Sequence, residues 1–391
     1  MGDELDSVDE IAARTNALVL GATGYIGSRL VPELLSRGVN VTVGVRDIGK
    51  LESFPWNDTV VVAAVDVSEP KTLAAATASQ DVVFYLVHSM DGDKFVERDH
   101  EAARNVAQSA HAHNVNRIVY LSGLIPDLDD RDLSDHLYSR MDVERVFTES
   151  PVGSVTLRAA IVLGAGSASF ELLRQLSERV PFVPLPSWLN SHVQPVSIRD
   201  VLDILVDVGL ATDPPPASID VGGPDAMKYS ELVRAYCATA GLNRVFLPLP
   251  FLPHRFVGAM ASYFVDLTPS LVQSLIDSLG HDMVCRPQEH PCALGSVTTS
   301  QALAASLAPA IHERTTESVD PHALRAHDAD WAGGDVEIAA GRSRVTGAAT
   351  GGVGWRSRRT SVPLVVSAGV VAVGATVSRV LVSGILRRGQ R

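Results

Sequence analysis

Residues 18–30 read Leu18-Val-Leu-Gly-Ala-Thr-Gly-Tyr-Ile-Gly-Ser-Arg-Leu30. An apolar run that predicts a strand leads into three glycines with the spacing G-x-x-G-x-x-G, and the apolar residues that follow recur with helical spacing. A strand, a glycine turn and a helix in this order bring the backbone close to a pyrophosphate, because the first N–H groups and the positive end of the helix face it. The stretch therefore predicts a dinucleotide-binding turn.

This turn supplies most of the predicted cofactor-binding residues, namely Gly21, Thr23, Gly24, Tyr25, Ile26 and Gly27. Arg46 follows the next predicted strand, Val41–Val45, at the point where such a fold meets the adenosine ribose. A guanidinium matches the oxygens of a 2′-phosphate, so Arg46 favours NADP(H), with Lys50 as a helper. The adjacent Asp47 keeps NAD(H) as the alternative.

Three further cofactor contacts are expected after the third and fourth predicted strands. Asp66 and Val67 follow the run Val60–Val65, where Asp66 would accept a hydrogen bond from the adenine amine. His88 follows the run Asp81–Val87 and is expected beside the path of the cofactor. An ordinary loop role is the alternative for Asp66 and His88.

Strand-like and helical patterns alternate as far as about residue 160, which predicts an α/β fold with a doubly wound parallel sheet, the Rossmann fold. We expect an acidic arm at residues 1–15 and the nucleotide-binding domain at 16–312. A small C-terminal substrate lobe is expected mainly at 162–190 and 222–312, followed by a flexible linker at 313–359, which is rich in small residues, and a hydrophobic segment at 360–386.

Composition excludes several classes of protein. The formal net charge is −12, and residues 355–391 carry arginines without any acid, so the body is too acidic to bind nucleic acid. The chain has 3 cysteines, which indicates no disulfide framework and a reducing cytoplasm. Cys285, His290 and Cys292 lack a fourth ligand and suitable spacing, so no metal site is predicted. Arginine in excess over lysine is typical of bacteria with GC-rich genomes.

Residues 360–378 carry no charged side chain, and the run has about the length that spans a bilayer core. Arginines flank it on both sides. The segment 360–386 is therefore a candidate transmembrane or membrane-docking helix, which would hold the protein at the cell membrane with its main domain in the cytoplasm. A soluble helix that docks on the body of a cytoplasmic protein is the alternative.

Several segments together resemble an atypical short-chain dehydrogenase/reductase, over roughly residues 16–300. They are Gly21-Ala-Thr-Gly-Tyr-Ile-Gly27, Val45-Arg-Asp47, Tyr85-Leu-Val-His-Ser-Met90, Ile118-Val-Tyr-Leu-Ser-Gly-Leu124 and Val193-Gln-Pro-Val196. The similar branch comprises bacterial NAD(P)-binding proteins, of the epimerase/dehydratase and NmrA-like type, that are related to an accessory subunit of respiratory complex I. The resemblance implies a cofactor site on the residues already named.

Active members of that superfamily use a Ser, and a Tyr and a Lys with the spacing Y-x-x-x-K on one helix. Here the candidate catalytic residues are Ser122, His136 and Arg140, with His and Arg in place of the Tyr and Lys. His136 would act as an acid near neutral pH, because imidazole titrates there, and Arg140 would hold the nicotinamide ribose. The alternative is a surface pair on a helix that has lost catalysis.

Two functions follow from this pattern. The first is an NADPH-dependent reductase of an apolar carbonyl or quinone-like substrate. The second is a non-catalytic NADP(H)-binding sensor, or an assembly or accessory protein of a membrane complex. A sugar-nucleotide enzyme fits less well, because such enzymes normally need the same Tyr and Lys.

Overall fold

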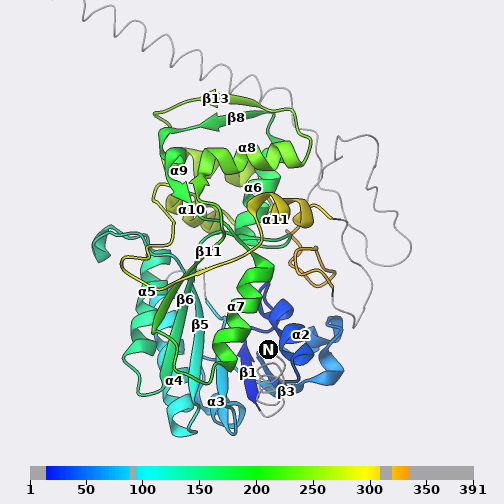
Figure 1. Cartoon of the computed structure of the whole chain (residues 1–391), viewed down its shortest axis with the longest axis vertical. Helices are drawn as coiled ribbons and strands as arrows, with labels where there is room; N and C mark the ends of the chain where they lie inside the picture. Colours follow the sequence, from blue (N-terminus) through cyan, green and yellow to red (C-terminus); the bar gives the residue numbers. More distant parts are fainter. Residues whose placement is uncertain (1–14, 89–93, 309–318, 334–391) are drawn as a thin grey trace, which may run out of the picture. The chain divides into compact units, whose positions relative to one another are not determined.

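An eight-stranded parallel sheet organises the chain, in the order β14-β11-β6-β5-β4-β1-β2-β3 (Figure 1). Its strands are β1 (Asn16–Leu20), β2 (Asn40–Val45), β3 (Val61–Ala64), β4 (Val82–Tyr85), β5 (Arg117–Gly123), β6 (Gly153–Ala159), β11 (Ser218–Gly222) and β14 (Cys292–Leu294). The strand order reverses between β1 and β4, so their carboxyl ends form the crevice where a doubly wound sheet binds its ligand. The predicted α/β fold with a doubly wound parallel sheet is confirmed.

The computed structural model describes residues 15–88, 94–308 and 319–333. Nearly all of the acidic arm predicted at 1–15 and the whole of the hydrophobic segment predicted at 360–386 lie outside these described residues. Within the described ranges, no helix combines the length and the apolar character needed to cross a bilayer.

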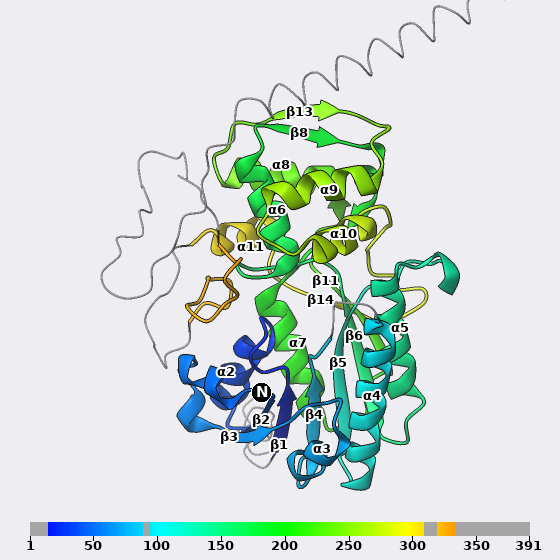
Figure 2. The same ribbon diagram turned by 180° about the vertical axis from the view of Figure 1, so that it is seen from behind.

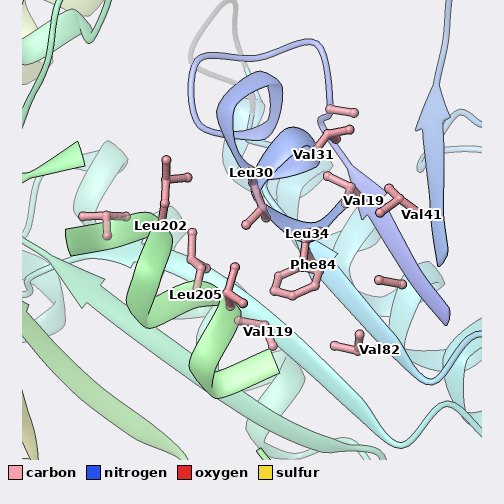
Figure 3. Close-up of a cluster of buried hydrophobic side chains, with 14 of the residues drawn as sticks. Val19, Leu30, Val31, Leu34, Val41, Val82, Phe84, Val119, Leu202 and Leu205 are labelled. Atoms are coloured by element: carbon pink, nitrogen blue, oxygen red, sulfur yellow. The ribbon is translucent and has the colours of Figure 1, made fainter. Parts of the chain in front are cut away.

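Helices cover both faces of the sheet, and each face has its own apolar core. Helices α2 (Gly27–Ser36) and α7 (Ile198–Leu210) bury leucines and valines on one face (Figure 3). Helices α3 (Pro70–Thr77), α4 (Phe95–Ala112) and α5 (Asp135–Thr148) cover the other. Gly209 lies against the ring of Phe84, where a Cβ atom would collide with the ring, so α7 packs closely on β4.

Parts of the chain beyond β6 build the small lobe at one end of the sheet (Figure 2). It contains helices α6 (Ala168–Arg179), α8 (Tyr229–Thr239), α9 (His254–Phe264), α10 (Pro269–Ser278) and α11 (Thr299–Ser306). Short strands pair in and beside it: β8 (Phe182–Leu185) with β13 (Val245–Pro248), β9 (His192–Val193) with β12 (Met227–Lys228), and β7 (Val162–Leu163) with β10 (Val196–Ser197). Short 3₁₀ helices are η1 (Ile48–Ser53), η2 (Asn57–Thr59), η3 (Asp130–Asp132) and η4 (Ser187–Asn190).

Two segments differ from the domain limits expected from sequence. Residues 292–294 fall within the range predicted for the small lobe, yet they pair with β11 at the edge of the main sheet. Residues 319–333, which we call the strap, fall within the range predicted as a linker. The strap, orange in Figure 1, packs against the domain and buries His322, Ala323 and Ala332. The strap mixes charged and small residues without periodicity, so it carries no local signal for such packing.

Candidate functional site

The glycine turn joins β1 to α2 in the geometry that its spacing predicts. Gly21 has a φ of +88°, which favours glycine, and its carbonyl accepts a hydrogen bond from the Gly24 N–H at 3.0 Å. A Cβ atom on Gly27 would collide with the Gly21 carbonyl. Helix α2 begins at Gly27, directly after the turn, so the positive end of its dipole faces the turn. The N–H groups of Ser28, Arg29 and Leu30 donate to the carbonyls of Gly24 and Ile26. This arrangement suits a pyrophosphate.

A cleft of about 1030 Å³ runs from this turn toward the small lobe. The turn residues Gly21, Thr23, Gly24, Tyr25, Ile26 and Gly27 line it. His88, Ser122, His136 and Arg140 also line it, so the structure brings the cofactor turn and the candidate catalytic residues to one continuous cavity. The carboxyl ends of β1, β4 and β5 explain this convergence, because they meet at the same edge of the sheet.

Three of the predicted cofactor residues do not line the cleft. Arg46 is exposed at the end of β2, and Asp66 accepts a hydrogen bond from the Ser68 N–H at 2.9 Å. Val67 packs partly buried against the apolar core beneath α3 and α4. From the loop after β2, it is Gly49, Lys50 and the residues that follow which line the cleft.

Helix α5 presents the His136 and Arg140 side chains on one face, because they are four residues apart. The Arg140 Nε donates a hydrogen bond to the His136 Nε2 at 3.2 Å, which makes Nε2 an acceptor and places the ring proton on Nδ1. The rings of His88 and His136 lie 6.5 Å apart between centroids. Tyr138, two residues from His136 on the same helix, is partly buried against the apolar cluster that contains Leu137 and Leu189.

The electrostatic setting of His136 differs from the sequence-based expectation. Burial, the Arg140 charge and the neighbouring His88 together lower the pKa of His136 to about 2. The lowered pKa keeps the ring neutral at neutral pH, which favours a hydrogen-bonding role over the expected imidazolium acid. The neutral ring retains one N–H donor, which suits a hydrogen-bonding role.

The strap forms part of the cleft wall, which sequence reasoning missed. Its residues His327, Asp328, Ala329, Asp330 and Trp331 line the cleft together with the glycine turn. Long-range contacts hold the strap here, among them the Gln175 amide donating to the Trp331 carbonyl and an anchor on α2, so no local pattern marks these residues as site residues.

That anchor is Arg29 on the first turns of α2, whose side chain is fully buried. Its Nη1 and Nη2 donate to the two carboxylate oxygens of Asp328, each at 2.7 Å. Its Nε donates to the Pro321 carbonyl at 2.8 Å, and Nη2 also donates to the carbonyl of Ala323 at 3.1 Å. The guanidinium lies over the ring of Tyr25, 4.1 Å from its centroid. The strap is therefore tied to the helix that carries the phosphate-binding turn.

The comparisons with known proteins agree with this geometry. Residues 21–147 match a family model described as NAD(P)H-binding. The chain is 27% identical over 276 residues to the chloroplastic divinyl chlorophyllide a 8-vinyl-reductase of Cucumis sativus, covering 66% of this chain and 64% of that protein. It is 24% identical over 263 residues to the mitochondrial NADH dehydrogenase [ubiquinone] 1 alpha subcomplex subunit 9 of Arabidopsis thaliana, covering 65% of each. The chain thus spans just under two thirds of the length of these relatives.

Solved structures share the fold at low sequence identity. A nucleoside-diphosphate-sugar epimerase from Staphylococcus aureus superposes with a TM-score of 0.57 at 14% identity, covering 74% of this chain and 100% of that chain. An NADPH-dependent quinone oxidoreductase from Escherichia coli superposes with a TM-score of 0.57 at 17% identity, covering 73% and 98%.

The Arg29–Asp328 pair gives a prediction for stability. Asp328→Ala leaves a buried guanidinium without its carboxylate, so we expect the free energy of unfolding to fall by about 3 kcal/mol, measured by denaturant unfolding. Asp330→Ala, an exposed position on the same strap, is the control and should change stability little. Equal stability of the Asp328 and Asp330 variants would contradict the anchoring role.

The pKa of His136 gives a second prediction. The pKa of His136 in the folded protein lies below its unfolded value of about 6.5. Below pH 6.5 the unfolded chain therefore binds a proton at His136 that the folded protein does not bind. Protonation of His136 in the unfolded chain therefore leaves the free energy of unfolding unchanged above pH 6.5 and lowers it as the pH falls. His136→Gln should therefore lose less stability than the wild type between pH 7 and 5, by up to about 1.4 kcal/mol per pH unit. Parallel pH profiles of the two proteins would contradict the shift.

Proposed function

Because the chain carries an NAD(P)-binding Rossmann domain of the NmrA-like and epimerase/dehydratase type, we propose that it is an NADPH-dependent reductase of an apolar carbonyl or quinone-like substrate. One observation carries the proposal: a single cleft joins the phosphate-binding turn to Ser122, His136 and Arg140. The cofactor's reactive end and a substrate would meet at these three residues.

The small lobe supports the apolar character of the substrate. Leu271 and Leu275 of α10 and Met283 line the same cleft as the glycine turn. Apolar side chains around a few convergent polar groups are typical of sites for largely apolar small molecules. The reductase class is consistent with two similar proteins, one called a vinyl-reductase and the other a quinone oxidoreductase.

In the proposed reaction, bound NADPH would supply a hydride to the carbonyl carbon of the substrate, and a proton from water would convert the resulting alkoxide to the alcohol. The Arg140 guanidinium stabilises the negative charge that develops on the substrate oxygen, and it does so without giving up a proton. The neutral His136 ring, held by Arg140 through Nε2, offers its Nδ1–H as a hydrogen-bond donor that orients the substrate. The hydroxyl of Ser122, which lines the cleft near the carboxyl end of β5, is a second donor to that oxygen.

A non-catalytic role is the second candidate, and a specific observation favours it. The positions of the family's Tyr and Lys hold a neutral His and an Arg that bond to each other. Such a pair can hold a cofactor without turning it over. A similar protein is named as a subunit of NADH dehydrogenase, which suggests an accessory or assembly role in a membrane complex.

Turnover separates the two candidates. Full-length protein with NADPH should show loss of nicotinamide absorbance on addition of short-chain quinones or apolar aldehydes and ketones. Arg140→Met should lower kcat about a hundredfold, because it removes a donor to the developing oxyanion. Arg145→Met, on the exposed side of the same helix, is the matched control and should retain activity. NADPH binding without turnover across the panel would favour the accessory role.

We also propose that the segment 360–386 attaches the protein to the cell membrane, with the main domain in the cytoplasm. The uncharged run at 360–378 and its flanking arginines support this. Full-length protein should fractionate with membranes and need detergent for release, whereas a chain ending at Arg359 should not. Recovery of the full-length protein in the detergent-free supernatant would contradict the attachment.

A further inference from the structure

The strap places an imidazole in the cofactor cleft that nothing above assigns. His327 lines the cleft next to Asp328, whose carboxylate is bound by the buried Arg29. The Arg325 N–H also donates to the Asp328 carboxylate, at 2.7 Å, and closes a tight turn on either side of His327. The position of the His327 imidazole is therefore set by the Arg29–Asp328 pair and not by the strap backbone alone.

The ring of His327 packs on Phe54, with 4.3 Å between centroids. Phe54 directly follows η1, the turn of chain after β2, and this turn also contributes Lys50 and Ser53 to the cleft. In a doubly wound nucleotide-binding domain, the end of the second strand lies beside the adenosine ribose. His327 therefore stands at the adenosine end of the cleft, away from the His136–Arg140 pair.

The polar atom of this side chain lacks a protein partner. Among the described residues, the Nε2 of His327 is buried and makes no hydrogen bond. A buried polar atom of this kind is costly, and native proteins usually satisfy it with a ligand or water. Lys50 on the same wall supplies a positive charge, whereas the exposed Glu52 supplies an opposing one. A hydrogen-bond donor beside an ammonium group is suited to a phosphate.

We propose that His327 and Lys50 bind the 2′-phosphate of the adenosine ribose of NADP(H), so that the strap is an integral part of the cofactor site. The inference rests on the proposed use of NADP(H). It replaces Arg46, which does not line the cleft, as the residue that distinguishes NADP(H) from NAD(H). In this proposal the Arg29–Asp328 pair does not contact the phosphate, and its role is to position His327.

Adenosine fragments test the proposal at the correct end of the cofactor. Binding of 2′,5′-ADP, 5′-AMP, NADPH and NADH to the full-length protein is measured by calorimetry. His327→Phe keeps an aromatic ring on Phe54 and removes both ring nitrogens, so it should raise the Kd of 2′,5′-ADP and of NADPH about tenfold. The Kd of 5′-AMP and of NADH should change less than about twofold. Lys50→Met should act in the same direction.

His111→Phe, on an exposed turn of α4, is the matched control and should bind as the wild type does. His327→Gln is a second variant that keeps a side-chain N–H donor, and it should recover part of the lost affinity if the Phe variant unfolds. If the wild type binds NADPH and the His327 and Lys50 variants bind it equally well, this inference fails and the proposed function stands. An equal loss of 5′-AMP and 2′,5′-ADP also overturns it. A wild type that binds neither NADPH nor NADH overturns both.

Discussion

The burial of the Arg29 guanidinium constrains the whole site. A buried charge is tolerated only when an opposite charge and further acceptors surround it, and here Asp328 and carbonyls from the strap supply them. Because Arg29 lies on the first turns of α2, satisfying it brings residues from almost three hundred positions later against the phosphate-binding helix. This requirement, together with contacts such as the Gln175 amide to the Trp331 carbonyl, holds the strap as a wall of the cleft.

Much of the fold could be predicted because its signals are local. The glycines at 21 and 27 have steric reasons, namely the positive φ of Gly21 and the close approach of the Gly21 carbonyl at Gly27. Alternating strands and helices led directly to a doubly wound sheet, whose carboxyl edge collects Ser122, His136 and Arg140. The spacing of His136 and Arg140 by one helical turn was enough to place them side by side.

What the sequence could not show depends on contacts between distant segments. The strap has no hydrophobic periodicity. The residues next to Arg29 and Asp328 in the sequence give no signal that these two side chains pair. The pKa of His136 depends on burial and on the charge of Arg140, which composition does not reveal. Arg46 follows β2, where a residue that contacts the adenosine ribose is expected. The Asp47 carboxylate accepts a hydrogen bond from the Gly49 N–H and caps η1, and Lys50 of this helix lines the cleft, whereas Arg46 does not.

Taken together, the geometry supports cofactor binding more directly than it supports a reaction, since the phosphate turn, the strap and the adenosine end are all in place. The most direct test is a crystal structure of the full-length protein grown with NADPH. We predict the pyrophosphate at the amino end of α2 and the nicotinamide ring beside Ser122, His136 and Arg140. A nucleotide bound elsewhere, or a nicotinamide ring turned away from these residues, would contradict the assignment of the cleft.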